Sequence, residues 1–150
     1  MERVFITGVS GFIGSYIADK LINNGYKVAA LLRHTNRLNY PSVQRLLNRM
    51  TFYYGSLTDF AAVRGAISNF KPDYIIHLGA ITPVAYSFDH PHEVTETNYI
   101  GTINMAESAK KECPNLKKFI FASSVEVYGY QDKREPFLET DEPKPDARMP

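Results

Sequence analysis

A glycine-rich turn near the N-terminus is the first feature of the sequence that could bind a ligand. Its glycines follow the spacing G-x-x-G-x-x-G, directly after the apolar run Val4–Ile6 and directly before a helical pattern. Glycine allows a tight turn, a close approach of backbone to a pyrophosphate and close packing of helix on sheet, while the N–H groups and dipole of the helix attract phosphates. The spacing predicts a dinucleotide site formed by Gly8, Ser10, Gly11, Phe12, Ile13 and Gly14.

The end of the second apolar run indicates which dinucleotide is bound. An acidic residue normally stands there and binds the 2′-hydroxyl of the adenosine ribose. Here Val28–Leu32 is followed by Arg33, with Arg37 nearby, and this stretch holds no acid. Because a guanidinium suits a 2′-phosphate, we predict NADP(H) as the cofactor, with NAD(H) as the second choice. The alternative interpretation is that Arg33 is a solvated charge at the end of a strand.

Strands and helices that alternate along the chain would position these residues. Short apolar and β-branched runs predict strands, and apolar residues recurring every three or four positions predict helices. The expected strands are Val4–Ile6, Val28–Leu32, Thr51–Tyr54, Tyr74–Leu78 and Lys118–Ser123. The expected helices run from Gly11 to about Asn23, near Ser42–Arg49, from an N-cap at Thr58 to Pro72, and from about Glu93 to Lys111.

This alternation predicts an α/β fold with a Rossmann-type, doubly wound parallel sheet. The expected strand order is 3-2-1-4-5, in three layers α/β/α, as one domain over residues 1–150. Such a sheet binds ligands beyond the carboxyl ends of its strands, where the strand order reverses. Functional residues should therefore follow Ile6, Leu78 and Phe121.

The composition narrows the class of protein. The 150 residues are 44% hydrophobic and carry a formal net charge of +1, which predicts a folded core and argues against nucleic acid or a membrane as partner. A single cysteine, Cys113, excludes an intramolecular disulfide and suits a cytoplasmic location. The cluster Asp89–Glu93 lacks the spacing of a metal site, so no metal is predicted. His77, inside an apolar run, is interpreted as a hydrogen-bonded core residue.

Four segments occur in the order typical of one enzyme family. They are Thr7–Gly14, Leu78–Ala80, Asn98–Thr102 and Ser123–Gly129, and the match covers essentially the whole chain. With this set the sequence resembles the extended short-chain dehydrogenase/reductase family, in its NAD-dependent epimerase/dehydratase group. The resemblance implies a nicotinamide dinucleotide as cofactor and a nucleotide sugar as substrate.

The resemblance implies further residues on the cofactor side. Leu78, Gly79 and Ala80 would line the nicotinamide half of the dinucleotide. Asn98 would bond to backbone near the active site and stabilise the break between the fourth strand and its helix. The family often has an Asp after the third strand that bonds the adenine. This chain has Ser56 there, followed by Leu57, and a serine is the weaker partner for a base.

On the substrate side, the resemblance implies roles for three residues. Ser124 would bond the sugar hydroxyl or ketone at which hydride transfer takes place. Glu126 stands where relatives that dehydrate or decarboxylate sugars carry an acid–base glutamate, and Thr82 would contact the substrate. The pair Ser124 and Glu126 favours a 4,6-dehydratase or a 4-keto-sugar reductase over a simple 4-epimerase.

The family's catalytic Tyr-x-x-x-Lys would begin where this sequence stops, at Arg148–Pro150. The one such spacing present, Tyr16–Lys20, lies on the first predicted helix and is interpreted as a chance pairing on a helix surface. The substrate domain is therefore expected to be absent, which leaves a sheet edge uncovered and favours a homo-oligomer or a complementing chain. Two alternatives to the enzyme stay open: a non-catalytic NADP(H)-binding fragment and a regulatory nucleotide-binding protein.

Overall fold

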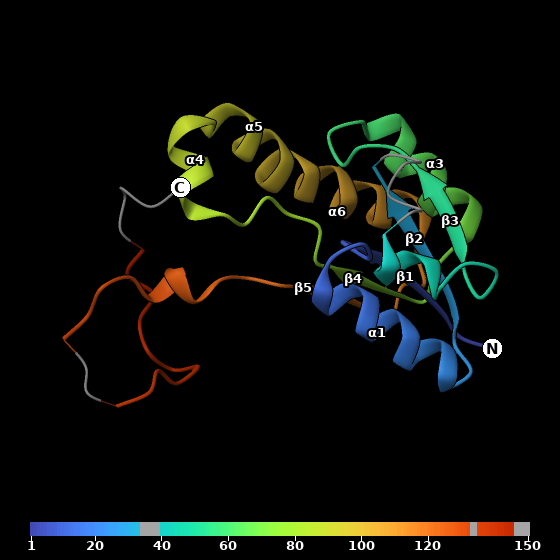
Figure 1. Ribbon diagram of the computed structural model, residues 1–150, viewed down its shortest axis with the longest axis horizontal. Helices are drawn as coiled ribbons and strands as arrows, with labels where there is room; N and C mark the ends of the chain where they lie inside the picture. The colour runs from blue at the N-terminus through green and yellow to red at the C-terminus, as the bar shows by residue number, and fades with distance from the viewer. Residues whose placement is uncertain (34–39, 133–134, 146–150) are drawn as a thin grey trace.

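Five parallel strands form one sheet at the centre of the molecule (Figure 1). The computed structural model describes residues 1–33, 40–132 and 135–145. The strands follow the order β3-β2-β1-β4-β5, so the predicted Rossmann-type topology is confirmed. Their bounds are β1 Arg3–Thr7, β2 Lys27–Leu32, β3 Thr51–Tyr54, β4 Tyr74–His77 and β5 Lys118–Phe121.

Helices cover both faces of this sheet and complete the three layers. They are α1 Phe12–Asn23, α2 Pro41–Gln44, α3 Phe60–Phe70, α4 Val84–Asp89, α5 Pro91–Thr95, the π-helix η2 Glu96–Ile100, α6 Gly101–Glu112 and the 3-10 helix η3 Val125–Tyr128. Figure 1 shows α1 on one face of the sheet and α3 with α6 on the other. None of the described helices is long and apolar enough to cross a membrane.

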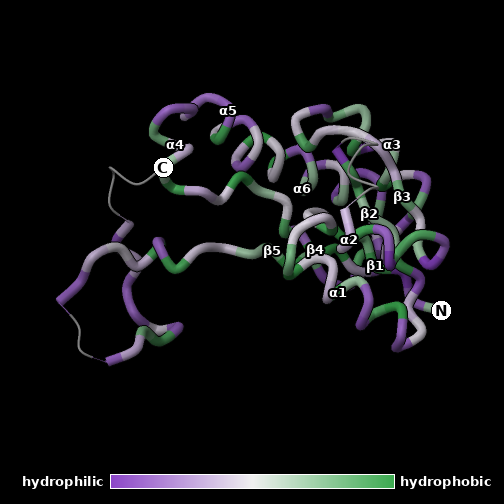
Figure 2. The backbone as a smooth tube through the Cα atoms, viewed as in Figure 1, coloured by the Kyte–Doolittle hydropathy of each residue, from purple (hydrophilic) through white to green (hydrophobic). Residues whose placement is uncertain are grey.

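Two separate cores form because successive residues of a strand point to opposite faces of the sheet. In β1, Phe5 is buried against α3 and α6, together with Phe70 and Met105. Val4 and Ile6 are buried on the side of α1. Hydrophobic residues accordingly concentrate on the central strands in Figure 2. The near-continuous apolar strands noted in the sequence are explained by this burial on both sides.

Two predicted helix boundaries are wrong, and local hydrogen bonds and dihedral angles explain both. The N-cap of α3 is Asp59, whose carboxylate accepts a hydrogen bond from Ala62 N–H at 3.0 Å. The predicted cap, Thr58, instead pairs its hydroxyl with Ser56 at 2.8 Å. The helix expected near Ser42–Arg49 is only the short α2, and Asn48 beyond it has a φ of +62°, which no α-helix accommodates.

The helix expected from Glu93 to Lys111 contains a wider turn that the apolar spacing did not indicate. The chain passes from α5 into the π-helix η2 before it continues as α6. The preceding segment, expected to be loop, also contains α4. Single π-turns are rare and tend to occur at functional sites, and this one carries Asn98.

The fifth strand stands at the edge of the sheet and is shorter than predicted. It ends at Phe121 rather than Ser123, although Ala122 N–H still donates to the His77 carbonyl at 3.1 Å. Ile120 and Phe121 are 44% and 53% exposed. An edge strand with exposed apolar side chains is an arrangement that natural sheets usually avoid.

Candidate active site at the strand ends

The glycine-rich turn packs backbone directly against backbone. Gly8 has a φ of +77°, and a Cβ built on it would lie 2.8 Å from both the carbonyl carbon and the oxygen of Leu78. A Cβ on Gly14 would lie 2.3 Å from the Gly8 carbonyl oxygen. Gly11 N–H donates to that same oxygen at 3.0 Å, which closes the turn. At Gly8 and Gly14 a side chain would therefore push the turn away from β4 or from α1.

The first turn of α1 offers amide donors to an anion. Gly11 is the N-cap and supplies no side-chain hydrogen bond, and no acidic residue stands in the first turn. The positive end of the helix dipole is therefore not offset by a carboxylate of that turn. Phe12, 79% exposed, and Ile13 lie beside these amides. The donors of this turn and the absence of an acidic side chain in it fit a pyrophosphate.

The end of β4 is held to β1 by a threonine that the sequence analysis did not single out. The buried Thr7 hydroxyl accepts hydrogen bonds from Leu78 N–H at 3.1 Å and Gly79 N–H at 2.9 Å. A Cβ on Gly79 would lie 3.0 Å from this same hydroxyl oxygen. The predicted segment Leu78–Ala80 is therefore anchored beside the glycine-rich turn. A buried hydroxyl at the end of an apolar strand is the signal that could have identified Thr7.

Asn98 occupies the position that the sequence analysis expected, against the backbone that leaves β4. Its side-chain oxygen accepts from Ile81 N–H at 2.8 Å, and its side-chain N–H donates to the Ile81 carbonyl at 2.9 Å. The carboxamide thus pairs with both backbone polar groups of Ile81, as a neighbouring strand would. Asn98 thereby holds the backbone at Ile81 through one accepted and one donated hydrogen bond.

Leu57 packs between two of the predicted segments, Leu78–Ala80 and Asn98–Thr102. A Cβ on Gly79 would lie 3.0 Å from Leu57 Cδ1, and a Cβ on Gly101 would lie 2.8 Å from Leu57 Cβ. The Leu57 carbonyl accepts from the Asn104 side chain at 2.9 Å. The loop after β3, which carries Ser56, is thereby tied to the end of β4 and the start of α6. The structure brings these predicted cofactor residues together.

The residues predicted to act on the substrate do not join this cluster. Ser124 is the N-cap of η3, and its hydroxyl accepts from Glu126 N–H at 3.2 Å. Both side chains are exposed, as is Thr82. Figure 1 shows the chain after β5 leading away from the sheet toward η3, drawn in orange. Arg37 and Arg148–Pro150, named in the sequence analysis, lie outside the described residues.

Arg33 lies just past the end of β2 and is exposed, as expected for either interpretation of its role. Its charge acts on Tyr86 of α4, where it opposes the rise in pKa of the phenol. The larger influence on that pKa is the hydrogen bond from the Tyr86 hydroxyl to Glu93 at 2.6 Å, which raises it. Arg33 therefore places a positive charge within electrostatic range of Tyr86 in α4.

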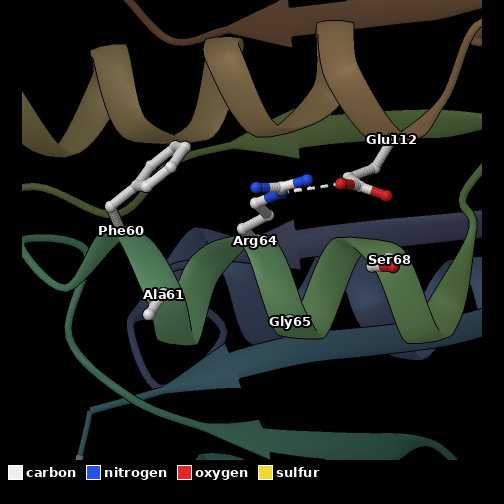
Figure 3. Close-up of a pocket in the computed structure, with 6 residues that line it drawn as sticks. All are labelled: Phe60, Ala61, Arg64, Gly65, Ser68 and Glu112. Atoms are coloured by element: carbon white, nitrogen blue, oxygen red, sulfur yellow. Dashed lines mark hydrogen bonds and ion pairs between the residues drawn. The ribbon is translucent and has the colours of Figure 1, made fainter.

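A hollow elsewhere on the surface is occupied by an ion pair. It lies between α3 and α6 and is lined by Phe60, Ala61, Arg64, Gly65, Ser68 and Glu112 (Figure 3). The Arg64 Nε and Glu112 carboxylate meet across it at 2.7 Å, and Lys71 approaches the same carboxylate at 3.2 Å. These cations lower the pKa of Glu112 to about 2. The hollow lies on the helical face rather than at the strand ends and is separate from the candidate site.

Comparison with known proteins gives a consistent set of relatives. A family model described as GDP-mannose 4,6 dehydratase matches residues 5–148. A curated human GDP-mannose 4,6 dehydratase is 34% identical over 134 residues, which are 83% of this chain and 36% of the human one.

Two solved structures extend the comparison to the fold. A Thermotoga maritima UDP-glucose 4-epimerase with UDP-glucose superposes with a TM-score of 0.83 and 35% identity, covering 96% of this chain and 45% of that one. A Thermus thermophilus UDP-glucose 4-epimerase in complex with NAD gives a TM-score of 0.80 and 29% identity, covering 95% and 44%. The chain thus spans less than half the length of these relatives.

Proposed function

The chain belongs to the GDP-mannose 4,6 dehydratase family, and from that premise we propose that it is the nicotinamide-dinucleotide-binding part of a nucleotide-sugar oxidoreductase of the epimerase/dehydratase type. The observation that carries the proposal is the contact between the glycine-rich turn and the end of β4. Gly8 touches Leu78 there, and the uncapped amides of α1 open on the same side. The NAD complex of the Thermus relative supports the class of cofactor.

In the proposed complex, the residues of this chain bind and orient the dinucleotide. The N–H groups at the start of α1 would hold the pyrophosphate, and Leu78, Gly79 and Ala80 would line the nicotinamide half. When bound, the dinucleotide supplies the acceptor or donor of a hydride. The hydrogen bonds of Thr7 and Asn98 to the backbone of β4 and its exit would keep that surface rigid, which favours a fixed geometry for transfer.

We propose NADP(H) as the preferred form because Arg33 follows β2 where an acid would repel a 2′-phosphate. The opposing consideration is that the Thermus relative holds NAD. Titration of NADPH and NADH against the chain, followed by nicotinamide fluorescence, decides the question. NADPH should bind more tightly, and Arg33→Ala should reduce the ratio of the two dissociation constants by about tenfold, the worth of one charge-assisted hydrogen bond near solvent.

The controls distinguish the preference for NADP(H) from the existence of the dinucleotide site. Gly65→Ala, a change in α3 far from the turn, should leave both affinities unchanged. Equal binding of NADPH and NADH with no effect of Arg33→Ala would reject the preference for NADP(H) alone. Failure of both dinucleotides to bind a folded chain would reject the dinucleotide site itself.

For the reaction, we propose a 4,6-dehydratase or a 4-keto-sugar reductase, with Ser124 at the sugar hydroxyl or ketone and Glu126 moving protons on neighbouring carbons. The human relative, a GDP-mannose 4,6 dehydratase, supports this choice, and the Thermotoga epimerase supports the nucleotide-sugar class. GDP-mannose and UDP-glucose are the first substrates to offer, with products resolved by chromatography. Glu126→Gln should abolish dehydration and leave dinucleotide affinity unchanged.

A second candidate is a dinucleotide-binding chain without turnover of its own. It is favoured by the placement of Ser124 and Glu126, both exposed and on a segment that leaves the sheet. The 150-residue chain would then bind the dinucleotide and convert neither nucleotide sugar. Turnover of either sugar by the purified chain would exclude this candidate. Turnover that is lost in Glu126→Gln would support the enzyme.

A further inference from the structure

A buried histidine connects the end of β1 to Thr102 of α6, whose hydroxyl in turn bonds the carbonyl of Asn98 in the π-helix. His77, the last residue of β4, is 1% exposed. Its Nδ1 lies 2.7 Å from the Thr7 hydroxyl, and its Nε2 lies 3.1 Å from the Thr102 hydroxyl. Phe119 and Phe121 of β5 cover the ring, with Phe121 stacked at 6.0 Å between centroids. The sequence analysis interpreted His77 as a hydrogen-bonded core residue, and its burial and two hydrogen bonds confirm this.

The hydrogen bonds of the Thr7 hydroxyl determine whether Nδ1 of His77 donates or accepts. A hydroxyl has one proton to donate and two lone pairs to accept with. Both lone pairs of Thr7 are engaged, by Leu78 N–H and Gly79 N–H. The proton must therefore point at His77 Nδ1, which accepts it. An Nδ1–H would face this proton and find no acceptor.

The Thr102 hydroxyl gives the same answer independently at the other ring nitrogen. It donates its single proton to the Asn98 carbonyl at 2.5 Å. It is therefore an acceptor toward the imidazole, and Nε2 must carry the proton. Both hydroxyls thus select one neutral tautomer. Burial favours the neutral ring as well, and it lowers the pKa of His77 to about 4.

The hydrogen bonds consequently run in one direction. Leu78 and Gly79 donate to Thr7, Thr7 donates to His77, His77 donates to Thr102, and Thr102 donates to the Asn98 carbonyl. The Asn98 side chain then pairs with both polar groups of Ile81. The chain of bonds starts and finishes on the segment that leaves β4, and it runs through β1, β4, α6 and the π-helix in between.

We propose that His77 is a positioning residue, held as its Nε2–H tautomer by Thr7 and Thr102, that fixes the π-turn of Asn98 and through it the segment Leu78–Ile81. A π-turn has hydrogen bonds wider than the α-helix and can relax to it, so a side-chain bond to the Asn98 carbonyl holds it in place. The consequence for the nicotinamide half rests on the proposed function, whereas the tautomer and the π-turn do not.

The tautomer is tested by long-range ¹H–¹⁵N correlation spectra of the chain labelled at its histidines. The His77 signals are identified by their loss in His77→Asn. We expect Nδ1 at the shift of an unprotonated nitrogen and Nε2 at that of a protonated one, unchanged from pH 8 to pH 5. The exposed His92 provides a comparison signal from a solvent-accessible ring in the same spectra. A protonated Nδ1, averaged tautomers or titration of His77 near pH 6.5 would overturn the proposal.

The coupling to Asn98 is tested by the matched variants Thr102→Val and Thr102→Ser. The amide of Ile81 reports on the Asn98 side chain because it donates to the Asn98 oxygen. We expect about tenfold faster hydrogen exchange of that amide in Thr102→Val, the effect of losing one hydrogen bond, and near-parental exchange in Thr102→Ser, which keeps the hydroxyl. Equal exchange in both variants would refute the coupling.

The amide of Phe5 in the centre of the sheet is the reference for global unfolding. If hydrogen exchange at the Phe5 amide accelerates as much as at the Ile81 amide in Thr102→Val, two other variants are compared instead. His77→Gln keeps a donor near the position of Nε2, whereas the side chain of His77→Asn does not reach Thr102. The Gln variant should protect Ile81 more than the Asn variant, and the reverse order would refute the proposal. Because these readouts need no dinucleotide, loss of dinucleotide binding with an intact tautomer would count against the proposed function alone.

Discussion

Replacement of Gly14 by alanine places a methyl group inside the backbone of the glycine-rich turn. The new Cβ would lie 2.3 Å from the Gly8 carbonyl oxygen, 2.8 Å from its carbon and 3.0 Å from Val9 Cα. Ordinary contact begins at about 3.4 Å, so the turn and α1 must separate by about 1 Å. All three contacts are backbone atoms, and no side-chain rotation relieves them.

The change in the free energy of unfolding caused by Gly14→Ala follows from two opposing effects. Overpacking against a rigid neighbour typically costs up to about 3 kcal/mol, and alanine in place of glycine inside a helix returns about 1 kcal/mol. The free energy of unfolding should therefore fall by about 2 kcal/mol, which lowers Tm by about 6 °C for a domain of this size. Displacement of Gly8 by the same methyl group should also weaken dinucleotide binding.

The matched control is Gly65→Ala in the middle of α3. A Cβ there meets nothing within 4 Å, so only the helix-propensity gain of at most about 1 kcal/mol remains. Tm should rise by about 2 °C. Both variants are measured by thermal unfolding and by urea titration, with circular dichroism as the signal. If Gly14→Ala proves as stable as Gly65→Ala, the close approach of α1 to the turn does not exist in solution.

Two further predictions concern acid stability and helix capping. His77 ordinarily titrates near pH 6.5 but has a pKa of about 4 in the fold, so only the unfolded chain takes up its proton between these values, and stability should fall by about 3 kcal/mol as the pH drops from 6.5 to 4. Urea titrations at several pH values, compared with His77→Gln, measure this loss, and equal slopes in the two proteins would show that His77 does not cause it. Asp59→Ala should cost about 1 kcal/mol by removing the N-cap of α3, whereas Thr58→Ala should cost less; the opposite order in thermal unfolding would restore Thr58 as the cap.

The strand order could be predicted from the sequence because each strand is a short apolar run with the same local signal. Val4–Ile6 is continuously apolar because β1 is buried on both faces of the sheet. The right-handed crossovers between parallel strands then leave few possible topologies. Helix boundaries are harder to predict because neighbouring residues compete for the N-cap position. Thr58 and Asp59 are both good caps, and the choice between them is made by the Ser56 hydroxyl, which no spacing rule contains.

The packing of the glycine-rich turn against the end of β4 could be predicted from local pattern, whereas the placement of Ser124 and Glu126 could not. Glycine spacing reports the backbone approach of Gly8 to Leu78, because a side chain is excluded there. The positioning network escaped prediction because Thr7 and Thr102 are far apart in sequence and meet only through His77. Ser124 and Glu126 lie at the start of η3, whose placement depends on contacts that a motif does not encode.

The register of β1 also constrains the order in which the molecule can assemble. Its first partner, β2, begins 24 residues along the chain, since Arg3 pairs with Lys27. Its second partner is β4, where Val4 pairs with Tyr74. During translation the second edge of the central strand must therefore wait until β4 has left the ribosome. Through that interval one edge of an apolar strand has no partner, and unpaired strand edges of this kind favour aggregation of incomplete chains.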